Sequence, residues 1–451
     1  MFWTKPGDEE YDERRALFNA MIDKRPRLIA GCETPADVRA ALDRARADDL
    51  EVAVRAGGHS VAGMSTNDDG LVIDVRPMKS IEVDPVRRRV RVGAGVTWGE
   101  LDHATQAHAL ATTGGRVSTT GVAGFTLGGG SGWLDRTHGL ACDNLLSVDL
   151  VTADGREIRA DADQHTELFW ALHGGGGNFG VATAFELQLH PVGPIVAAGL
   201  LVWRAAAADE LTRAFRDWVE HAPDELAAWL MLLTGPAEDW LPQELHGQEI
   251  VLVAGMWVGD VDEGMGMFGP LKALSPEVDL VAPMPYAEFQ AILDDVPGNR
   301  HYWSADYHDA LPDEALRVFV ESATSAPSPL SQQIILPWGG AIAGVADQDT
   351  PMSQRDAAWV SHPFAVWQDP ADDAANIEWV RRWRRGIAPY TTGGVYLNFI
   401  GNEGQDRVRS AFGEAKYERL RRVKSDYDPG NVFRGNQNIA PAPGTRVSSP
   451  G

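Results

Sequence analysis

The sequence predicts an α+β fold in two domains, on the basis of its length, its mixed hydrophobic patterns and one cluster of proline and glycine. A chain of 451 residues is longer than one ordinary domain, so we expect more than one core. Residues 34–189 mix helix-like and strand-like patterns. Pro191, Gly193 and Pro194 then interrupt them, as turn residues do between elements. Strand and helix patterns resume afterwards, which places a boundary near residue 195.

Hydrophobic periodicity predicts the individual elements of both halves. The first helix is expected at 34–49, because Thr34 can cap it and Pro35 suits its first turn. The turn 153–156, Ala-Asp-Gly-Arg, predicts a hairpin. The predicted strands are 51–55, 70–75, 90–92, 145–152, 181–189, 196–203, 227–234, 249–257, 364–367 and 394–400. The other predicted helices are 98–108, 166–172, 206–221 and 262–273.

The composition excludes several classes of partner. Asp and Glu number 64 against 40 Lys and Arg, giving a net charge of −24, which disfavours nucleic acid and anionic membranes. No apolar run approaches the roughly 18 residues of a membrane span. The polar stretch Met1–Arg27 lacks the apolar core of a signal peptide, so we expect a cytoplasmic protein. The two cysteines, Cys32 and Cys142, form no CxxC pair, so we expect neither a disulfide framework nor a zinc site.

Glycine is concentrated in three stretches, 55–63, 121–132 and 174–180. Adjacent glycines allow backbone N–H groups to approach a ligand closely, and such nests suit a pyrophosphate. A single glycine-rich loop is more often a structural turn. Three of them within residues 55–180 predict one long ligand held by several backbone cradles.

Other readings of these glycines fail on their context. Gly175-x-Gly177-x-x-Gly180 fits the GxGxxG pattern, but a helix precedes it and a strand follows, the reverse of the Rossmann order. The segment 173–176, His-Gly-Gly-Gly, resembles the oxyanion motif of esterases, which also need a GxSxG elbow. The nearest candidate, residues 129–133, lacks the final glycine, and no GK[ST] of a P-loop exists.

Several ordered motifs carry a more specific resemblance. The loop Arg55-x-Gly57-Gly58-His59-Ser60 resembles the flavin-attachment loop of the berberine bridge enzyme-like group, within the vanillyl-alcohol oxidase/p-cresol methylhydroxylase (PCMH) superfamily. Further segments resemble the group's second attachment loop, its FAD cradles, its Tyr-x-Asn signature and its C-terminal motif. These segments are 139–145, 118–132, 177–181, 395–399, 427–433 and 436–439. The resemblance runs from about Arg27 to Pro441.

The resemblance implies the architecture and the cofactor. Residues 1–195 would form a PCMH-type FAD-binding domain of two α+β subdomains, to which the segment 400–451 returns. Residues 196–399 would form a substrate domain, an antiparallel sheet covered by helices. FAD would be bonded twice, through its 8α-methyl group to His59 and through C6 to Cys142. The remaining expected cofactor-binding residues are Arg55, Gly57, Gly58, Ser60, Gly63, Thr119, Gly121, Gly124, Gly128, Gly132, Val181, Asn436 and Asn438.

The chemistry of the two attachment residues agrees with this expectation. His59 is the one nucleophile in a loop otherwise built for backbone approach. A thiolate at Cys142 is soft enough to add to the flavin ring. The alternatives are a loop histidine satisfied by hydrogen bonds and an inert, packed thiol.

Flavin oxidation of a C–H bond also needs a base for the neighbouring O–H or N–H proton. Tyr396 is the candidate base, and a polar or cationic neighbour should lower its pKa. Asn398 lies two residues further along the predicted strand 394–400 and so shares its face. Gln368, which follows the strand 364–367, is the polar partner that the resemblance implies. The alternative role for Tyr396 is a core aromatic.

Tyr302 and Trp303 fall where the family's substrate domain lines its cleft, and an aromatic pair can stack on a sugar or another planar substrate. Core packing is the alternative. Val61 stands where plant members often have a tyrosine, so a two-tyrosine site is not expected. Leu145 lies where the family gates oxygen, three residues after Cys142, and its size favours a dehydrogenase.

These expectations together predict oxidation of a small-molecule alcohol, a carbohydrate or a secondary-metabolite hydroxyl, by hydride transfer to flavin N5. The acceptor of choice is O2, because the sequence indicates no dedicated electron-acceptor partner. The alternatives are an oxidative cyclase, a dehydrogenase with a different acceptor, and a flavin- or sugar-binding protein without turnover. Neither the substrate nor the oligomeric state follows from the sequence.

Overall fold

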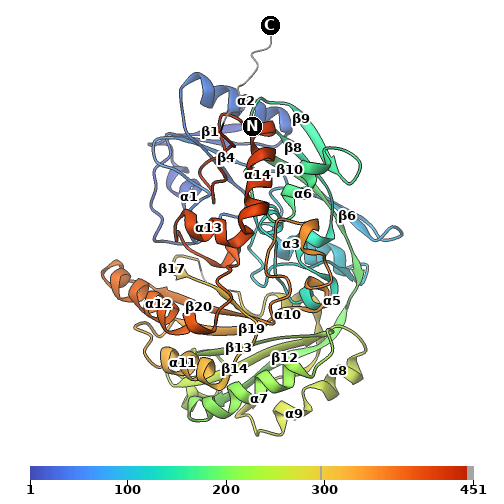
Figure 1. The fold of residues 1–451 in the computed structure, drawn as a ribbon, viewed down its shortest axis with the longest axis vertical. Coiled ribbons are helices and arrows are strands. Elements are labelled where there is room, and N and C mark those ends of the chain that lie inside the picture. Colours follow the sequence, from blue (N-terminus) through green and yellow to red (C-terminus); the bar gives the residue numbers. More distant parts are fainter. Residues whose placement is uncertain (295–296, 444–451) are drawn as a thin grey trace.

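The computed structural model describes residues 1–294 and 297–443. The chain forms two lobes, one above the other in Figure 1. The upper lobe contains the N-terminal part of the chain together with its C-terminal helices, and the lower lobe contains the middle. The predicted α+β fold is confirmed. None of the helices in the described ranges is long and apolar enough to cross a membrane.

Two larger sheets build the upper lobe, and the short strands β7 (Leu110–Ala111) and β11 (His190–Pro191) form a further antiparallel pair. The first has the order β1 (Phe2–Thr4), β2 (Leu28–Gly31), β4 (Leu71–Asp74) and β3 (Val52–Arg55), with β2, β4 and β3 parallel. Helix α2 (Pro35–Ala47) is capped by Thr34, as predicted. The Thr34 side chain accepts a hydrogen bond from the Asp37 N–H in a capping box. Strand β3 ends directly before the first glycine-rich loop.

The second sheet is antiparallel, in the order β5 (Ile81–Asp84), β6 (Arg89–Gly93), β10 (Val181–Gln188), β8 (Leu145–Val151) and β9 (Glu157–Asp161). Strands β8 and β9 form the predicted hairpin, in which Thr152 N donates to Arg156 O. Helices α3 (Trp98–Gln106), α4 (Val122–Leu127) and α6 (Thr166–Leu172) complete this lobe. The second and third glycine-rich stretches lie around α4 and after α6.

A nine-stranded antiparallel sheet forms the lower lobe. Its main strands are β12 (Ile195–Arg204), β14 (Glu249–Trp257), β13 (Leu226–Thr234), β19 (Gln332–Pro337), β20 (Trp359–Trp367) and β17 (Arg300–Trp303); β15 (Val278–Asp279), β16 (Ala282–Pro285) and β18 (Asp306–His308) pair at its margins. Helices α7 (Ala208–Glu220), α11 (Asp313–Ala323) and α12 (Asp373–Ile387) cover the face away from the upper lobe. Side chains alternate between the faces: Leu230 packs with these helices, whereas Trp229 and Met231 join the core of the upper lobe.

The C-terminal helices α13 (Gln405–Phe412) and α14 (Glu414–Tyr427) lie in the upper lobe (Figure 1). Helix α14 is fastened there by Lys424, whose Nζ is buried and donates to Asp428 Oδ2 at 2.6 Å, Asn178 O at 2.7 Å and Phe433 O at 3.0 Å. One ammonium group therefore joins this helix, the C-terminal motif and the third glycine-rich loop. Residues 444–451 of the predicted C-terminal segment lie outside the described residues.

Two predicted elements are wrong in detail. The strand expected at 394–400 is not formed; Leu397–Phe399 is a 3₁₀ turn in which Phe399 N donates to Tyr396 O at 3.1 Å. The helix expected at 262–273 is split into α8 (Val261–Met267) and α9 (Gly269–Lys272), because Pro270 cannot donate the hydrogen bond that would continue α8.

Replacing Lys424 with methionine should lower the free energy of unfolding by about 3–5 kcal/mol, because the Asp428 carboxylate is left buried and unpaired. Urea denaturation followed by circular dichroism measures this change. The control is Arg46→Met, which removes the exposed ion pair with Asp43 and should cost less than about 1 kcal/mol. Equal losses in the two variants would show that the buried pair has no special role.

Candidate functional site

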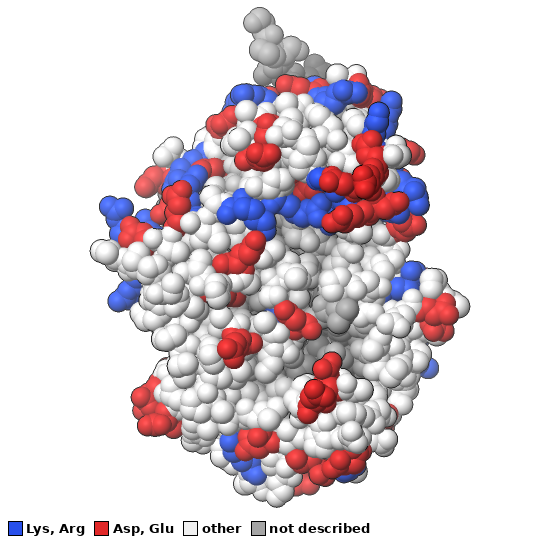
Figure 2. Space-filling view, turned by 180° about the vertical axis from the view of Figure 1, so that it is seen from behind, with Lys and Arg blue, Asp and Glu red and all other residues white. Residues whose placement is uncertain are grey.

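A cavity of about 690 Å³ lies between the two lobes, a size usual for cofactor and substrate sites. Its upper walls come from the three glycine-rich stretches, and its lower wall comes from the inner face of the nine-stranded sheet. Figure 2 shows a hollow in the surface at the level where the lobes meet. The sequence-predicted residues that line the cavity are Gly57, Gly58, His59, Ser60, Gly121, Gly124, Gly128, Asn398, Asn436 and Trp303.

The backbones of the first two glycine-rich stretches are in direct contact. A Cβ added to Gly57 would lie 2.8 Å from the Cα of Gly121, and one added to Gly121 would lie 2.9 Å from the Cα of Gly57. Neither position therefore accepts a larger residue without moving the backbone. The contact places the loop that carries His59 against the loop that carries Thr119.

His59 is held as a neutral imidazole. Burial lowers its pKa to about 4, so the ring is uncharged at neutral pH. Its Nε2 lies 2.9 Å from Thr119 Oγ1, and the ring stacks on Phe18 with 4.3 Å between centroids. Thr119 therefore holds the ring through Nε2, and no described residue forms a hydrogen bond with Nδ1. Thr119, predicted to bind the cofactor, acts on His59 instead and does not line the cavity.

The glycines at 124 and 177 leave space that a side chain would fill. Both line the cavity, and a Cβ added to either would meet no atom within 4 Å. Gly176, beside Gly177, has a φ of +71°, which favours glycine. A long ligand that needs backbone contact fits these walls, as the sequence predicted for FAD.

The C-terminal motif adds an amide to the same wall. Asn436 lines the cavity, and its Nδ2 donates to Gly177 O at 3.1 Å and Phe433 O at 3.3 Å. Its Oδ1 is buried without a hydrogen-bond partner among the described residues. Such an oxygen is free to accept a hydrogen bond from a ligand. The Oδ1 of Asn438 is likewise unpartnered there, but Asn438 does not line the cavity.

Four residues expected to bind the cofactor do other work. Arg55 donates through Nη1 to Arg14 O and through Nη2 to Ala16 O at 2.5 Å, so it secures the N-terminal segment. Two glycines and a valine are set by packing: Gly63 lies against Ile22, Gly132 against the Gly114 carbonyl, and Val181 is buried in β10. None of the four lines the cavity.

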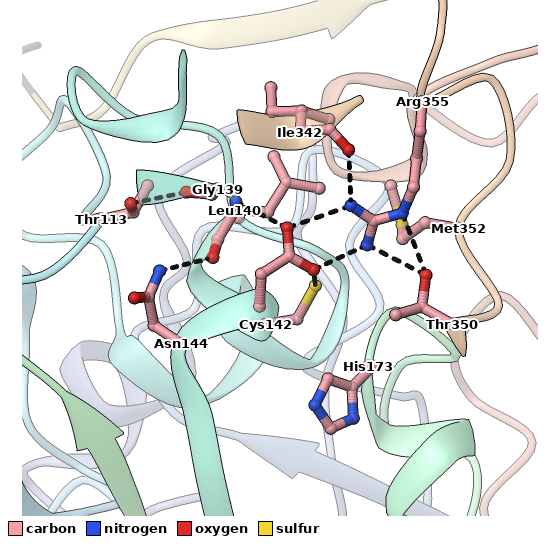
Figure 3. Close-up of polar contacts among 12 residues, drawn as sticks. Thr113, Gly139, Leu140, Cys142, Asn144, His173, Ile342, Thr350, Met352 and Arg355 are labelled. Carbon is pink, nitrogen blue, oxygen red and sulfur yellow. Dashed lines mark hydrogen bonds and ion pairs between the residues drawn. The ribbon is translucent and has the colours of Figure 1, made fainter. Parts of the chain in front are cut away.

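Cys142 is also away from the cavity. It is fully buried in a 3₁₀ turn, and its N–H donates to Gly129 O at 2.8 Å. Figure 3 shows it among polar contacts that include Arg355 and Thr350. Arg355 donates twice to the Asp143 carboxylate, at 3.0 and 2.7 Å, and burial raises the pKa of the Cys142 thiol well above its ordinary value. In this structure the thiol is therefore enclosed, and burial disfavours its thiolate form.

Tyr396 and Asn398 meet, but not as neighbours on a strand. Asn398 Nδ2 donates to Tyr396 Oη at 3.2 Å across the 3₁₀ turn, and the N–H groups of Gly130 and Ser131 donate to the same oxygen at 2.7 and 2.9 Å. Tyr396 is fully buried and does not line the cavity, whereas Asn398 does. Burial raises the pKa of Tyr396, and these hydrogen bonds only partly offset it. The expected lowered pKa is wrong: Tyr396 supports the 128–131 loop from behind.

The three remaining sequence-predicted residues lie in different places, and one of them lines the cavity. Gln368 is exposed beyond the end of β20, where its Nε2 donates to Asn299 Oδ1 at 3.4 Å, so it is not a partner of Tyr396. Tyr302 packs against the cluster of Trp367 and Trp379 on the far side of the sheet. Trp303, one residue later, points the other way and lines the cavity.

Arg116 and His362 are ionisable residues of the cavity wall that the sequence did not predict. Arg116 is buried between Trp133 and Trp229, 4.7 and 4.3 Å from their ring centroids, and donates to Gly132 O at 2.6 Å. His362 lies in β20, two residues before Phe364, and both face the cavity. The sequence signal for His362 was a histidine within the mainly apolar segment 359–367.

Comparisons with known proteins show the family to which this chain is similar. The family model described as FAD binding domain matches residues 26–161, and the one described as berberine and berberine like matches residues 395–440. (R)-6-hydroxynicotine oxidase of Paenarthrobacter nicotinovorans is 32% identical to this chain, over 97% of it and 96% of that protein. The FAD-linked oxidoreductase YgaK of Bacillus subtilis is 31% identical, over 96% of this chain and 95% of that protein.

The solved structures agree as well. The crystal structure of 6-hydroxy-D-nicotine oxidase from Arthrobacter nicotinovorans matches with a TM-score of 0.88 at 28% identity, over 98% of both chains. A berberine bridge enzyme-like protein of Physcomitrella patens matches with a TM-score of 0.87 at 22% identity, over 98% of this chain and 96% of that one, which shows the common fold. The chain therefore belongs to the berberine bridge enzyme-like family of FAD-linked oxidoreductases.

Proposed function

We propose that this enzyme oxidises an apolar alcohol, with FAD bonded to His59 and O2 as the final acceptor. The observation that carries the proposal is the neutral, oriented imidazole of His59 on the wall of a cavity whose other upper walls are backbone cradles. FAD, when bound, accepts a hydride from the substrate carbon. The oxidase name of the 32% identical relative supports O2 as the acceptor.

The geometry supports attachment at His59 rather than at both predicted residues. A bond to the flavin requires a nucleophile with access to the cavity. His59 has that access, whereas Cys142 is enclosed and held as a thiol by burial. Single attachment through Nδ1 of His59 is therefore the form that we propose.

The lower half of the cavity favours the secondary-metabolite class over the carbohydrate class. Its sheet wall is mainly apolar, with Gln332 and His362 as its polar members. The apolar residues are Leu200, Trp229, Met231, Leu233, Leu252 and Ile334, with Trp303, Phe364 and Phe399 beside them. Each sugar hydroxyl buried there without a partner would cost about 1–3 kcal/mol. A planar, apolar substrate instead gains from contact with the aromatic rings.

Digestion of the acid-precipitated protein should yield FAD mass on the peptide that contains His59 and none on the peptide that contains Cys142. Flavin should remain on the protein in Cys142→Ala and should become extractable in His59→Ala, because only the imidazole is bonded. Peptide mass spectrometry and the visible spectrum of the pellet measure both. Flavin on the Cys142 peptide would restore double attachment, and a colourless protein that takes up no FAD would overturn the proposal.

Filling the cradle should prevent flavin uptake. Gly177→Val places carbon atoms in the space beside Asn436, and overpacking of this kind should weaken uptake of added FAD by about tenfold or more. The ratio of flavin to protein absorbance measures it. Gly266→Val is the matched control, because Gly266 is exposed in α8 with no atom near its Cβ position. Normal flavin content in Gly177→Val would place the cofactor elsewhere.

Anaerobic mixing with candidate substrates tests the substrate class. Cinnamyl alcohol, as a planar apolar alcohol, should bleach the flavin faster than cellobiose by at least about tenfold, because cellobiose leaves several hydroxyl groups unpaired. Absorbance of the flavin during stopped-flow mixing measures the rate. Faster bleaching by cellobiose would reverse the assignment in favour of a carbohydrate.

A further inference from the structure

Alcohol oxidation needs a group that takes the hydroxyl proton, and the burial of Tyr396 away from the cavity leaves that role open. Five of the described residues that line the cavity are ionisable: His59, Arg116, Glu238, Asp294 and His362. A proton acceptor must be uncharged or anionic, must reach the substrate and must have an unoccupied lone pair.

Four of the five are unsuitable. Arg116 carries a permanent charge and lies 3.5 Å from Asp135 in an ion pair. Asp294 is exposed, and its two oxygens accept hydrogen bonds from Ser118 N and Ser118 Oγ, both at 2.6 Å. Glu238 is exposed on the loop after β13, so water occupies the lone pairs of its carboxylate. His59 is the residue that the proposed function assigns to the flavin.

His362 meets the requirements of geometry. Its Nδ1 lies 2.7 Å from the carbonyl oxygen of Ser304. A carbonyl only accepts, so Nδ1 carries the hydrogen and the lone pair of the neutral ring is on Nε2. No described residue forms a hydrogen bond with Nε2. This nitrogen is also not one of the fully buried polar atoms that lack a partner, so it is accessible. His362 lines the cavity.

The ring of His362 is also fixed in orientation. It stacks on Phe399 with 4.5 Å between centroids and 12° between planes. Trp303 and Phe364 meet it edge-on at 5.6 and 5.4 Å. Three aromatic neighbours and one hydrogen bond therefore prevent the ring from turning, and the same aromatic residues form the apolar wall expected to hold the substrate.

Burial keeps this imidazole neutral. It lowers the pKa of His362 to about 4, against a smaller upward effect of the Ser304 hydrogen bond. No charged group in the described part of the chain contributes to the shift. At neutral pH the lone pair on Nε2 is therefore available, and the Ser304 carbonyl is positioned to stabilise the ring once it gains a proton.

We propose that His362 is the catalytic proton acceptor of this site, a role that rests on the proposed alcohol oxidation. The substrate O–H bond breaks and its proton moves to Nε2. The C–H bond on the adjacent carbon breaks, and its hydrogen leaves as hydride, with both electrons, to the flavin. The oxygen keeps the electron pair of the former O–H bond and uses it to form the C=O bond of the product.

The first test needs no turnover. In protein labelled with ¹⁵N-histidine, the resonances missing from His362→Gln identify His362, and their shifts report its tautomer. We expect a neutral ring with hydrogen on Nδ1 from pH 6 to pH 8, because the pKa is well below this range. A hydrogen on Nε2, or a charged ring at pH 7, would overturn the proposal.

The second test measures recognition of a hydroxyl proton, with 4-nitrophenol as the probe. Its ring fits an apolar chamber and its O–H can donate to Nε2. His362→Leu should weaken binding about tenfold through the lost hydrogen bond, whereas His362→Gln keeps an acceptor and should bind within about twofold. The control His103→Gln, at an exposed position of α3, should match the wild type. Equal binding by wild type and His362→Leu would contradict the assignment.

The third test separates binding from catalysis. With any alcohol that bleaches the flavin, His362→Gln should lower the bleaching rate by about 100-fold or more with little change in the apparent dissociation constant, because glutamine accepts a hydrogen bond but not a proton. An unchanged rate would exclude His362 as the base even if the oxidation itself is established. If no alcohol bleaches the flavin, the function fails, while the tautomer and the probe still report on His362.

Discussion

The contact between Gly57 and Gly121 is the constraint on which the site depends. Two backbones meet there at a separation that excludes any Cβ, so the loop after β3 and the loop before α4 form one wall. The wall sets His59 against Thr119 and leaves the glycine at 124 open to the cavity. Side chains of ordinary size at the two contact positions would separate the loops and with them the histidine and its hydrogen-bond partner.

The first twenty residues reinforce that wall and join it to the lower lobe. Arg55 secures the segment by bonding its carbonyl groups, Phe18 stacks on both His59 and His301, and Asn19 donates to Val61 O and His301 O. The arginine beside the glycines therefore secures the N-terminal segment. The position of the imidazole is determined by contacts from two distant parts of the chain, Phe18 and Thr119.

The sequence predicts best what depends on backbone conformation and local order. The glycine loops, His59 and Asn436 all reach the cavity, because glycine at close approaches leaves a clear pattern. The predictions that the structure does not bear out concern how side chains are oriented in the folded chain. Strand alternation gives no warning that residues 397–399 turn, so the shared strand face predicted for Tyr396 and Asn398 is not formed. Neighbours such as Tyr302 and Trp303 differ only in the face they occupy, and no local signal in the sequence decides which face is inward.

The alternation of side chains along the nine-stranded sheet has a consequence for how the enzyme can diversify. Inward positions such as Met231 and Ile334 touch the ligand space, whereas their outward neighbours hold the helices beneath. Replacement of an inward residue changes the shape of the chamber without contact to the flavin cradle, which belongs to the other lobe. A single replacement at such a position can thus change the substrate range and leave the residues of the flavin cradle unchanged.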